Sequence, residues 1–549
     1  MPGIWKPLTT QPNFKTSTMM LLTDGRVMVQ EEAAKHWHAL TPDSNGSYLN
    51  GQWSTLADMS FWRRYYSSGI LKDGRVFLCG GEQSGDTGDS NKGEIYDPVT
   101  DSWSPISTPP WPTVGDAATC VLPDGKVMIG SISSGACLIY DPSTDSWATT
   151  GAQPGNTNEE SWVLLPDNTI LTVQCFPPYG GQKYLISSGV WQDEGTPPVT
   201  LVDPVMAEIG PAMFMYNGKA IFFGAMNSSG HAKTALYTHP TSPSGVGTWA
   251  AGPDIPNVNG QTVVCNDCPA ALMPNGKVLF CSAPFVYNQW GSPITFFEYD
   301  PVANTITPAP TPPNNGAQLF WSRMLLLPSG EVLFSPSANN VQVYVPDGGP
   351  LDAWRPTITG VTTMGATGTI TGTQLNGLSQ ACMYGDDCYP CTNYPLVQLT
   401  NVSSGTVQYC RTFNFSTMGI ATGTTAQSCQ FDLAGVAAGQ YELRVIANGI
   451  SSLIHNFQVG RIKPQAVDVV LKQEFEWFGK LVAEGDPFDW LQQIIDPEII
   501  AMQSELRSLA NGVSRLNSLI QTLELPQVGS QVAKEAKGQD RADNVEGQS

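Results

Sequence analysis

Residues 67–103, SSGILKDGRVFLCGGEQSGDTGDSNKGEIYDPVTDSW, contain the pattern that decides the fold. A first apolar run ends at Asp73-Gly74, a second ends at Gly80-Gly81, and Tyr96-Asp97-Pro98 then precedes Trp103. An Asp-Gly pair supplies the positive φ angles of a tight hairpin turn, and paired glycines let a strand pass close to its neighbours. The stretch therefore predicts four short antiparallel strands, which must stack on further copies to bury both faces.

The same plan recurs along the first 350 residues. Hairpin patterns of this kind stand at 19–29, 69–81, 120–130, 163–173, 213–224, 271–282 and 324–335. Most copies end in a tryptophan, namely Trp53, Trp103, Trp147, Trp191 or Trp249. The last copy lacks its outermost strand, whereas residues 3–8, GIWKPL, have the character of one. The sequence thus predicts a seven-bladed β-propeller over 1–350 whose ring is closed by residues 3–8, which leaves no open sheet edge.

A different all-β pattern occupies residues 355–460. It begins with PTITGVTTMGATGTITGT and ends with YELRVIANGISSLIHNFQVG, and its strands are short and alternating. Its length of about 105 residues suits an immunoglobulin-like β-sandwich. The predicted fold class is therefore all-β, with a helical segment added at the C-terminus.

The repeat resembles a kelch-type β-propeller, and a propeller followed by such a sandwich resembles the galactose oxidase and glyoxal oxidase family. The resemblance covers residues 1 to about 460 and is most specific at Tyr384-Gly385-Asp386-Asp387, Asn393-Tyr394-Pro395-Leu396 and Asn448-Gly449-Ile450. It implies a copper radical centre made of a tyrosine crosslinked to a cysteine, a tyrosine followed by a histidine, and a further histidine.

Most of these ligand positions carry other residues in this chain. The crosslinked tyrosine falls on Tyr65, but the cysteine position falls on Thr18 and the tyrosine-histidine pair falls on Phe320-Trp321. The last histidine would stand near Cys388 or Tyr389, where there is none. Aromatic carbon offers copper neither imidazole nitrogen nor phenolate oxygen. We therefore predict no copper centre, no other metal or cofactor, and no catalytic residues of the oxidase kind.

A set of charged and aromatic residues precedes the innermost strands and is expected to line the mouth of the propeller. These residues are Lys15, Trp62, Arg64, Tyr65, Trp111, Asp116, Glu160, Trp162, Asp267, Trp321 and Arg323. They suit a sugar ligand, because aromatic rings stack on the apolar side of a pyranose while charged groups bind its hydroxyls. The alternative is that the same groups pair among themselves and fill the channel, since buried polar groups need partners.

The twelve cysteines allow several interpretations. Those in apolar strands act as small hydrophobic groups; they are Cys79, Cys120, Cys175 and Cys281. A second cluster favours disulfides over zinc ligands or free thiols, and Cys265 with Cys268 forms a candidate bridge at the mouth. This cluster consists of Cys382, Cys388, Cys391, Cys410 and Cys429.

The composition changes after residue 460 to a helical pattern. Residues 467–484 have the spacing of an amphipathic helix, and Asp496-Pro497 is a typical helix start. A coiled-coil seam at 499–523 predicts a homo-oligomer or docking to a larger assembly, with a helix that folds back on the propeller as the alternative. The seam consists of Ile499, Met502, Leu506, Leu509, Val513, Leu516, Ile520 and Leu523. The helical segment is thus 461–525, and the polar tail 526–549 is predicted to be disordered.

Charge and hydropathy narrow the range of partners. A formal net charge of −21 argues against nucleic acid or an anionic membrane as the main partner, since both would repel it. No apolar run reaches a membrane-spanning length, and the N-terminus has no signal-peptide core. We therefore expect an extracellular or particle-associated protein without a recognisable signal peptide, with a cytoplasmic location as the alternative.

Together these features predict a non-catalytic binding or assembly protein, a propeller head displayed on a coiled coil. The head is expected to bind a glycan or a surface, as in an adhesin, a fibre or a particle subunit, because several weak heads on one stalk gain avidity. One alternative is an enzyme, either a copper radical oxidase-like protein or a glycan-active hydrolase that uses Asp116, Glu160 and Asp267. Another alternative is a purely structural subunit of a larger assembly.

Overall fold

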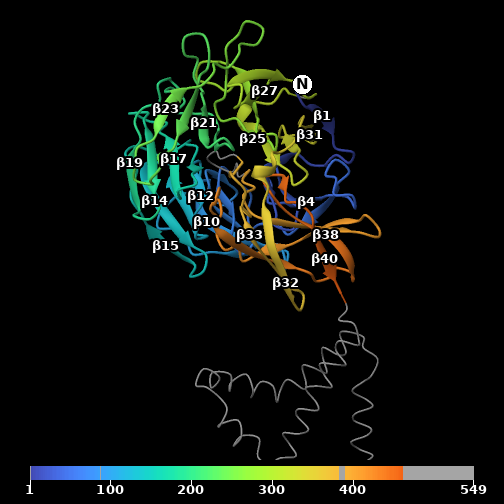
Figure 1. Ribbon diagram of the computed structural model, residues 1–549. Coiled ribbons are helices and arrows are strands. Elements are labelled where there is room, and N and C mark those ends of the chain that lie inside the picture. The colour runs from blue at the N-terminus through green and yellow to red at the C-terminus, as the bar shows by residue number, and fades with distance from the viewer. Residues whose placement is uncertain (1, 87, 314, 382–389, 461–549) are drawn as a thin grey trace, which may run out of the picture. The chain divides into compact units, whose positions relative to one another are not determined.

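The structure is a computed structural model (Figure 1), and it describes residues 2–86, 88–313, 315–381 and 390–460. Two compact units divide the chain, Met1–Val459 and Gly460–Ser549. The helical segment 461–525, its coiled coil 499–523 and the tail 526–549 lie outside the described residues, so they remain predictions. Within the described part, no helix has the length and apolar character that crossing a membrane requires.

Seven antiparallel sheets follow one another along the first 350 residues, six with four strands and one with five. The first contains β2 (Thr16–Leu21), β3 (Val27–Glu31), β4 (Trp37–Thr41) and β5 (Gln52–Leu56). The second contains β7 (Ser67–Ile70), β8 (Val76–Gly81), β10 (Ser90–Asp97) and β11 (Ser102–Pro105). The third contains β12 (Thr119–Val121), β13 (Val127–Ser131), β14 (Ser134–Asp141) and β15 (Ser146–Thr149). The fourth contains β16 (Val163–Leu164), β17 (Thr169–Val173), β18 (Gly181–Leu185) and β19 (Val190–Asp193).

The remaining three sheets follow the same order. The fifth contains β20 (Ala212–Phe214), β21 (Lys219–Phe223), β22 (Thr234–Thr238) and β23 (Thr248–Ala251). The sixth contains β24 (Val263–Val264), β25 (Ala270–Leu272), β26 (Val278–Pro284), β27 (Thr295–Asp300) and β28 (Thr305–Ala309). The seventh contains β29 (Arg323–Leu326), β30 (Val332–Ser335), β31 (Gln342–Val345) and β1 (Ile4–Pro7). The short elements are β6 (Arg63–Arg64), β9 (Gln83–Ser84) and the 3-10 turns η1 (Leu319–Trp321) and η2 (Asp352–Trp354).

One strand of each sheet lies innermost, namely β2, β7, β12, β16, β20, β25 or β29. β2 is buried along its whole length, whereas β5 is mostly exposed, and the other sheets follow this gradient. Innermost strands of neighbouring sheets approach each other, β7 beside β12, β16 beside β20, and both β2 and β25 beside β29. At the outer margin, β1 and β31 lie side by side (Figure 1), with Ile4 opposite Val345. The N-terminal strand therefore completes the last sheet. We call these seven sheets the repeat domain.

In six of the seven sheets, a tryptophan of the outer strand connects the sheet to another chain segment. Trp103 Nε1 donates to the carbonyl oxygen of Ala57 at 2.9 Å, and Trp147 Nε1 donates to that of Ser107 at 2.7 Å. Its ring also packs on the tyrosine of the neighbouring strand, with 5.2 Å between the ring centroids of Tyr96 and Trp103. Each tryptophan therefore acts as a wedge with a fixed polar end, a common use of buried indole groups.

Residues 357–459, which we call the sandwich, form two antiparallel sheets. One contains β32 (Thr357–Met364), β33 (Thr367–Thr373), β37 (Ala426–Asp432) and β36 (Thr412–Phe413), in this spatial order. The other contains β35 (Val407–Cys410), β34 (Leu396–Asn401), β38 (Gly439–Ala447), β39 (Ile450–Ser451) and β40 (His455–Val459).

Hairpin glycines of the repeat domain fit closely against the sandwich. Gly25 and Gly74 have φ angles of 80° and 85°. A Cβ atom on Gly25 would lie 2.5 Å from the ring of Tyr409, and one on Gly74 would lie 2.8 Å from the carbonyl oxygen of Thr412. Glycine is therefore required at each of these two hairpin turns for two reasons. It adopts the positive φ angle of the turn, and it leaves room for the close approach of the sandwich.

The sandwich covers one end of the innermost strands. Tyr394 donates from its hydroxyl to the carbonyl oxygen of Leu21, the last residue of β2. Gln380 Oε1 accepts from the amide of Leu164, the last residue of β16, at 3.1 Å. Because these contacts lie at the C-terminal ends of the strands, the opposite end of the repeat domain is where the strands begin and where a mouth is expected.

Candidate functional site

Three of the predicted residues, Lys15, Arg64 and Trp321, lie together in one cavity. Each stands shortly before the innermost strand of its sheet, which is β2, β7 or β29. The cavity has a volume of about 830 Å³. We call it the mouth cavity, and it is lined by Lys15, Glu32, Ala33, Arg64, Gly316, Ala317, Gln318, Trp321, Pro336, Ser337 and Ala338.

The guanidinium group of Arg64 lies against two indole rings. Its central carbon is 5.0 Å from the ring centroid of Trp321 and 6.0 Å from that of Trp62. Arg64 also forms an ion pair with Glu32 and donates to Gln83 Oε1 at 3.2 Å. A cation beside an indole face is attracted by the ring quadrupole. These four neighbours thus hold the side chain of Arg64, which is still 19% exposed.

The aromatic wall continues beyond Trp321. Its ring centroid is 5.0 Å from that of Phe320, which in turn is 4.8 Å from that of Trp290. Trp321 is partly exposed. Arg323 is only 7% exposed and donates to the carbonyl oxygens of Phe320 at 2.6 Å and Ser322 at 2.9 Å. Arg323 therefore fixes the turn η1 that carries the wall, and it is not among the lining residues.

Lys15 supplies an available cation to the mouth cavity. Its side chain is exposed, and it forms no ion pair with any residue that the structure describes. Its carbonyl oxygen accepts from the amide of Glu32 at 2.8 Å, which fixes the backbone on both sides of the cavity. Because Glu32 is already paired with Arg64, the ammonium of Lys15 is left to meet a ligand.

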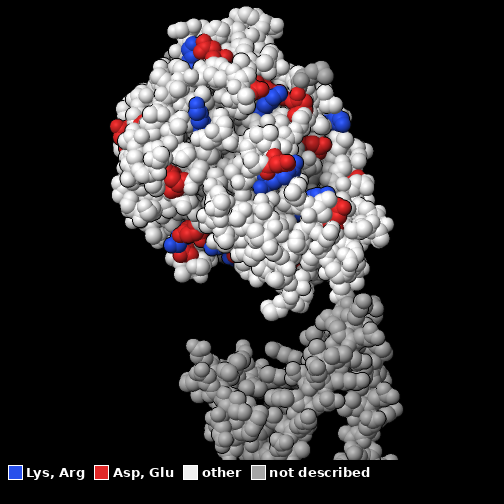
Figure 2. All heavy atoms as spheres, viewed as in Figure 1, with Lys and Arg blue, Asp and Glu red and all other residues white. Residues whose placement is uncertain are grey.

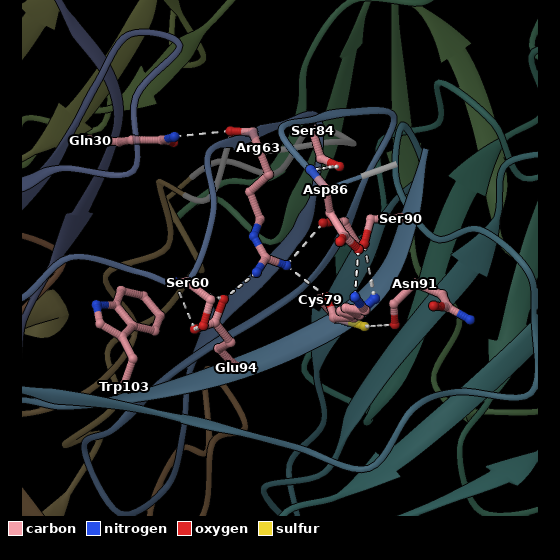
Figure 3. A network of polar contacts seen from close by, with 12 residues as sticks. Gln30, Ser60, Arg63, Cys79, Ser84, Asp86, Ser90, Asn91, Glu94 and Trp103 are labelled. Carbon is pink, nitrogen blue, oxygen red and sulfur yellow. Dashed lines mark hydrogen bonds and ion pairs between the residues drawn. The ribbon is translucent and has the colours of Figure 1, made fainter. Parts of the chain in front are cut away.

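A buried ion pair anchors the segment that carries Trp62 and Arg64 (Figure 3). The side chain of Arg63 is fully buried and pairs with Glu94 of β10. It also donates to the carbonyl oxygens of Gly80 at 3.1 Å and Lys92 at 2.7 Å. Glu94 accepts in addition from the hydroxyl of Ser60 at 2.7 Å. Paired charges in a dry interior favour one arrangement, which restricts the positions of the two residues flanking Arg63.

Carboxyl groups gather around Glu159. Burial, followed by the charges of Asp116, Glu208 and Asp267, raises the pKa of Glu159 well above its usual value. A hydrogen bond between the side chains of Asp116 and Glu159 acts in the same direction. Asp116 and Asp267 were predicted, and Glu208 was missed. The sequence could have indicated Glu208, because this residue also stands just before an innermost strand, β20.

Glu160 and Trp162 do not line the mouth, which corrects the sequence-based prediction. Both are fully buried. Glu160 accepts hydrogen bonds from Gln153 at 2.6 Å, Trp162 at 3.1 Å and Thr172 at 3.1 Å. Burial raises the pKa of Glu160 to about 8 in spite of these three donors. The pair fills the interior between sheets, where a substrate has no access.

Two further predicted residues, Tyr65 and Trp111, are partly buried and lie outside the lining of the mouth cavity. Tyr65 has a φ of 52°, and its carbonyl oxygen accepts from the amide of Asp116 at 2.8 Å. The carbonyl oxygen of Trp111 accepts from Asn91 at 2.6 Å. Both residues therefore contribute backbone contacts that connect neighbouring loops.

We expect the free energy of unfolding to fall as the pH rises from about 5 to about 7. Burial, followed by the charges of Asp116 and Asp89, raises the pKa of Glu82 to about 7, whereas an unfolded glutamate titrates near 4.3. Between these values the folded chain binds more protons than the unfolded chain, so stability declines with pH. A fully shifted group changes the free energy of unfolding by ~1.4 kcal/mol per pH unit. Glu82 is partly exposed, so its contribution to this slope is smaller. In urea titrations Glu82→Gln should flatten this slope, and an unchanged slope would contradict the assignment.

Four described cysteines, Cys265, Cys268, Cys410 and Cys429, do not form the bridges that the sequence favoured. Cys265 and Cys268 are free thiols, and both donate to the carbonyl oxygen of Cys281, at 3.5 and 3.0 Å. The other free thiols, all buried, are Cys79, Cys120, Cys137, Cys175, Cys281, Cys410 and Cys429. The strands place them in the interior, where a thiol packs as a small hydrophobic group. Cys382 and Cys388 lie outside the described residues.

Three of the predicted oxidase ligand positions hold side chains without the donor atoms that copper prefers. Thr18 is fully buried in β2, and Phe320 and Trp321 present carbon rings in η1. Across the ranges that the structure describes, no group of three or more histidine, cysteine, aspartate or glutamate side chains could hold a metal ion. Thr18, Phe320 and Trp321 do not supply the imidazole, phenolate or thiolate that copper prefers, whereas Tyr65 keeps a phenol.

Comparisons with known proteins agree with the architecture. A family model of the Kelch motif matches residues 63–110. A solved structure described as a novel fungal alcohol oxidase of the AA5 family, in complex with copper, covers 84% of this chain and 100% of its own, at 14% identity and a TM-score of 0.50. Virginiamycin B lyase from Staphylococcus aureus covers 62% of this chain and 98% of its own, at 13% identity and a TM-score of 0.40. No curated protein matches the chain. The kelch motif and the likeness to the alcohol oxidase show that this chain has a kelch-type, propeller-like all-β fold.

Proposed function

We propose that residues 1–460 form a seven-bladed kelch-type propeller with an immunoglobulin-like sandwich, and that this head binds a glycan in the mouth cavity without transforming it. The seven sheets and the pairing of β1 with β31 support the architecture. The observation that carries the binding role is the cavity of about 830 Å³ in which Lys15, Arg64 and Trp321 meet.

Each group in the mouth cavity suits one part of a sugar. The partly exposed ring of Trp321 fits the apolar C–H face of a pyranose. Lys15 donates hydrogen bonds, Glu32 accepts them, and Gln318 and Ser337 do both, which matches the mixed character of hydroxyl groups. The volume of about 830 Å³ falls within the ~300–1,000 Å³ of typical small-ligand sites.

Two observations favour binding over catalysis. Three of the predicted copper-ligand positions hold Thr18, Phe320 and Trp321, which do not supply the required donors, although Tyr65 keeps a phenol at a fourth. A hydrolase built on Asp116, Glu160 and Asp267 would need an accessible Glu160, but this carboxyl is fully buried.

The head is proposed to be displayed in several copies. The helical segment 461–525, with its seam at 499–523, would form a homo-oligomer or dock to a larger assembly. Linked heads gain avidity from effective concentration without any new contact. This arrangement suits an extracellular or particle-associated protein. A purely structural subunit, in which the mouth cavity holds no ligand, is the second candidate.

We expect Trp321→Ala to weaken glycan binding at least about tenfold, because the ring supplies the stacking face and holds Arg64. The measurement is a glycan array that identifies a ligand, followed by titration calorimetry with the soluble sugar. Phe413→Ala is the matched control, because Arg411 lies 4.3 Å from this ring in the sandwich and the pair reproduces the cation–ring contact away from the cavity.

The proposal fails if a broad array retains no glycan, or if Trp321→Ala and Phe413→Ala bind equally well. Metal analysis with an absorbance spectrum gives an independent result. Stoichiometric copper with a radical band would establish an oxidase, and it would show that side chains other than Thr18, Phe320 and Trp321 hold the ion.

A further inference from the structure

The strand β32 forms an open edge of the sandwich. Its sheet has the order β32-β33-β37-β36, so β32 pairs on one side only. The strand is eight residues long, with a largely exposed pattern, and none of its backbone groups bonds outside the sheet to a described residue. In Figure 1, β32 runs along the outer margin of the sandwich. An edge of this kind presents unpaired amide and carbonyl groups to any strand that approaches it.

The register shows which backbone groups point outward. Gly365 and Ala366 form a two-residue turn between Met364 and Thr367, so these flanking residues form a hydrogen-bonded pair. Hydrogen-bonded and non-hydrogen-bonded pairs then alternate along an antiparallel ladder. Thr363 and Val361 fall in the non-hydrogen-bonded pairs, and their amide and carbonyl groups therefore face the open side.

The usual devices that protect an edge are missing here. Residues 356–381 contain no lysine, arginine, aspartate or glutamate, and the region around β32 is white in Figure 2. Proline is absent from β32 itself, and Met364 at its end is 86% exposed. Natural edge strands are normally kept apart by charges, prolines, short length or a covering segment.

Three other edges of the described fold differ from β32. The opposite edge of the same sheet, β36, reaches the repeat domain through the amide of Thr412, which donates to the carbonyl oxygen of Thr23 at 3.0 Å. In the second sheet, the amide of Val407 in β35 donates to the carbonyl oxygen of Ser44 at 2.8 Å. The outer strand β1 is four residues long and includes Lys6 and Pro7. β32 therefore combines length, exposure and neutrality in a way that these edges do not.

We propose that β32 pairs antiparallel with β32 of a second copy of this chain across a two-fold axis. An antiparallel pair of identical strands presents the same groups from both sides, as an isologous interface requires. Two copies of a chain with a net charge of −21 repel each other, and a neutral edge is where that repulsion is weakest. Continuing the ladder would join two four-stranded sheets into one of eight strands.

The pairing is weak on its own. Eight residues at ~3.4 Å each give a contact about 27 Å long. Such a contact buries less than the ~1,200–2,000 Å² of a stable interface. Self-association is therefore expected only at high protein concentration, or where copies are already held close together.

The test uses the full chain with Leu509→Asp and Leu516→Asp, so that the predicted seam at 499–523 does not contribute to association. This double variant is called the parent chain in the experiments below. Sedimentation velocity at increasing concentration should show a reversible monomer–dimer equilibrium. Thr363→Pro removes an outward amide without touching the β32–β33 ladder, and it should weaken dimerisation at least about tenfold. Thr363→Ala keeps the amide and should dimerise like the parent chain.

Amide hydrogen exchange gives a second measurement that needs no variant at position 363. In the parent chain, the amides of Val361 and Thr363 should exchange more slowly at high than at low concentration, while that of Thr362 should not change. The proposal is overturned if the parent chain stays monomeric up to millimolar concentration, which is also the result expected if a different protein covers this edge. It is equally overturned if Thr363→Pro and Thr363→Ala dimerise alike.

Discussion

Arg63→Met is expected to lower the free energy of unfolding by about 3–5 kcal/mol. The substitution leaves the carboxylate of Glu94 in the interior, where only 4% of its side chain is exposed, without its cationic partner. It also removes the donors to the carbonyl oxygens of Gly80 and Lys92. A buried charge that loses its partner costs far more than the net value of the pair. The quantity to measure is the midpoint and slope of urea unfolding at neutral pH.

Arg75→Met is the matched control. Arg75 pairs with Asp73 at 2.7 Å, but the two side chains are 35% and 40% exposed. An exposed pair contributes about 0–1 kcal/mol, so this variant should unfold almost like the parent. Equal losses from the two substitutions would show that burial does not set the cost. Because Arg63 lies between Trp62 and Arg64, glycan binding should also weaken at temperatures where Arg63→Met is still folded.

The repeat was readable from the sequence because its signals are local. An Asp-Gly pair fixes a hairpin wherever it stands, and a tryptophan after Tyr-Asp-Pro marks an outer strand whether or not its partner is known. Both patterns predicted the propeller-like all-β fold, which the kelch motif and the likeness to the alcohol oxidase confirm. Residues 3–8 could be placed at the last sheet because the seventh copy lacked a strand.

The site was less predictable because side-chain direction depends on backbone angles that the sequence does not state. Glu159 has a φ of 57°, and its neighbour Glu160 is buried away from the other carboxyl groups. Counting alternate residues back from β16 therefore does not tell which of the two faces the channel. Glu32 and Gln83 were missed for another reason, since they follow second strands. An antiparallel second strand ends where the first begins, and that rule would have placed Glu32 at the mouth and Gln83 beside Arg64.

Lys183→Met is expected to destabilise the fold by a similar amount, about 3–5 kcal/mol. Lys183 and Glu194 are both fully buried and lie 2.8 Å apart. The ammonium also donates to the carbonyl oxygen of Gly245 at 2.6 Å. Glu194 accepts from the hydroxyl of Tyr237 at 2.6 Å and from the amide of Gly247 at 2.7 Å, so the pair connects the fourth sheet to the fifth.

A double-mutant cycle separates the ion pair from general packing. Glu194→Gln keeps the shape of the side chain and removes its charge, so Lys183→Met combined with Glu194→Gln should cost less than the sum of the two single changes, by about 1–3 kcal/mol. Lys126→Met is the control, because Lys126 is 42% exposed and lies 3.7 Å from its carboxylate partners. Strict additivity of Lys183→Met and Glu194→Gln would mean that the two charges do not depend on each other.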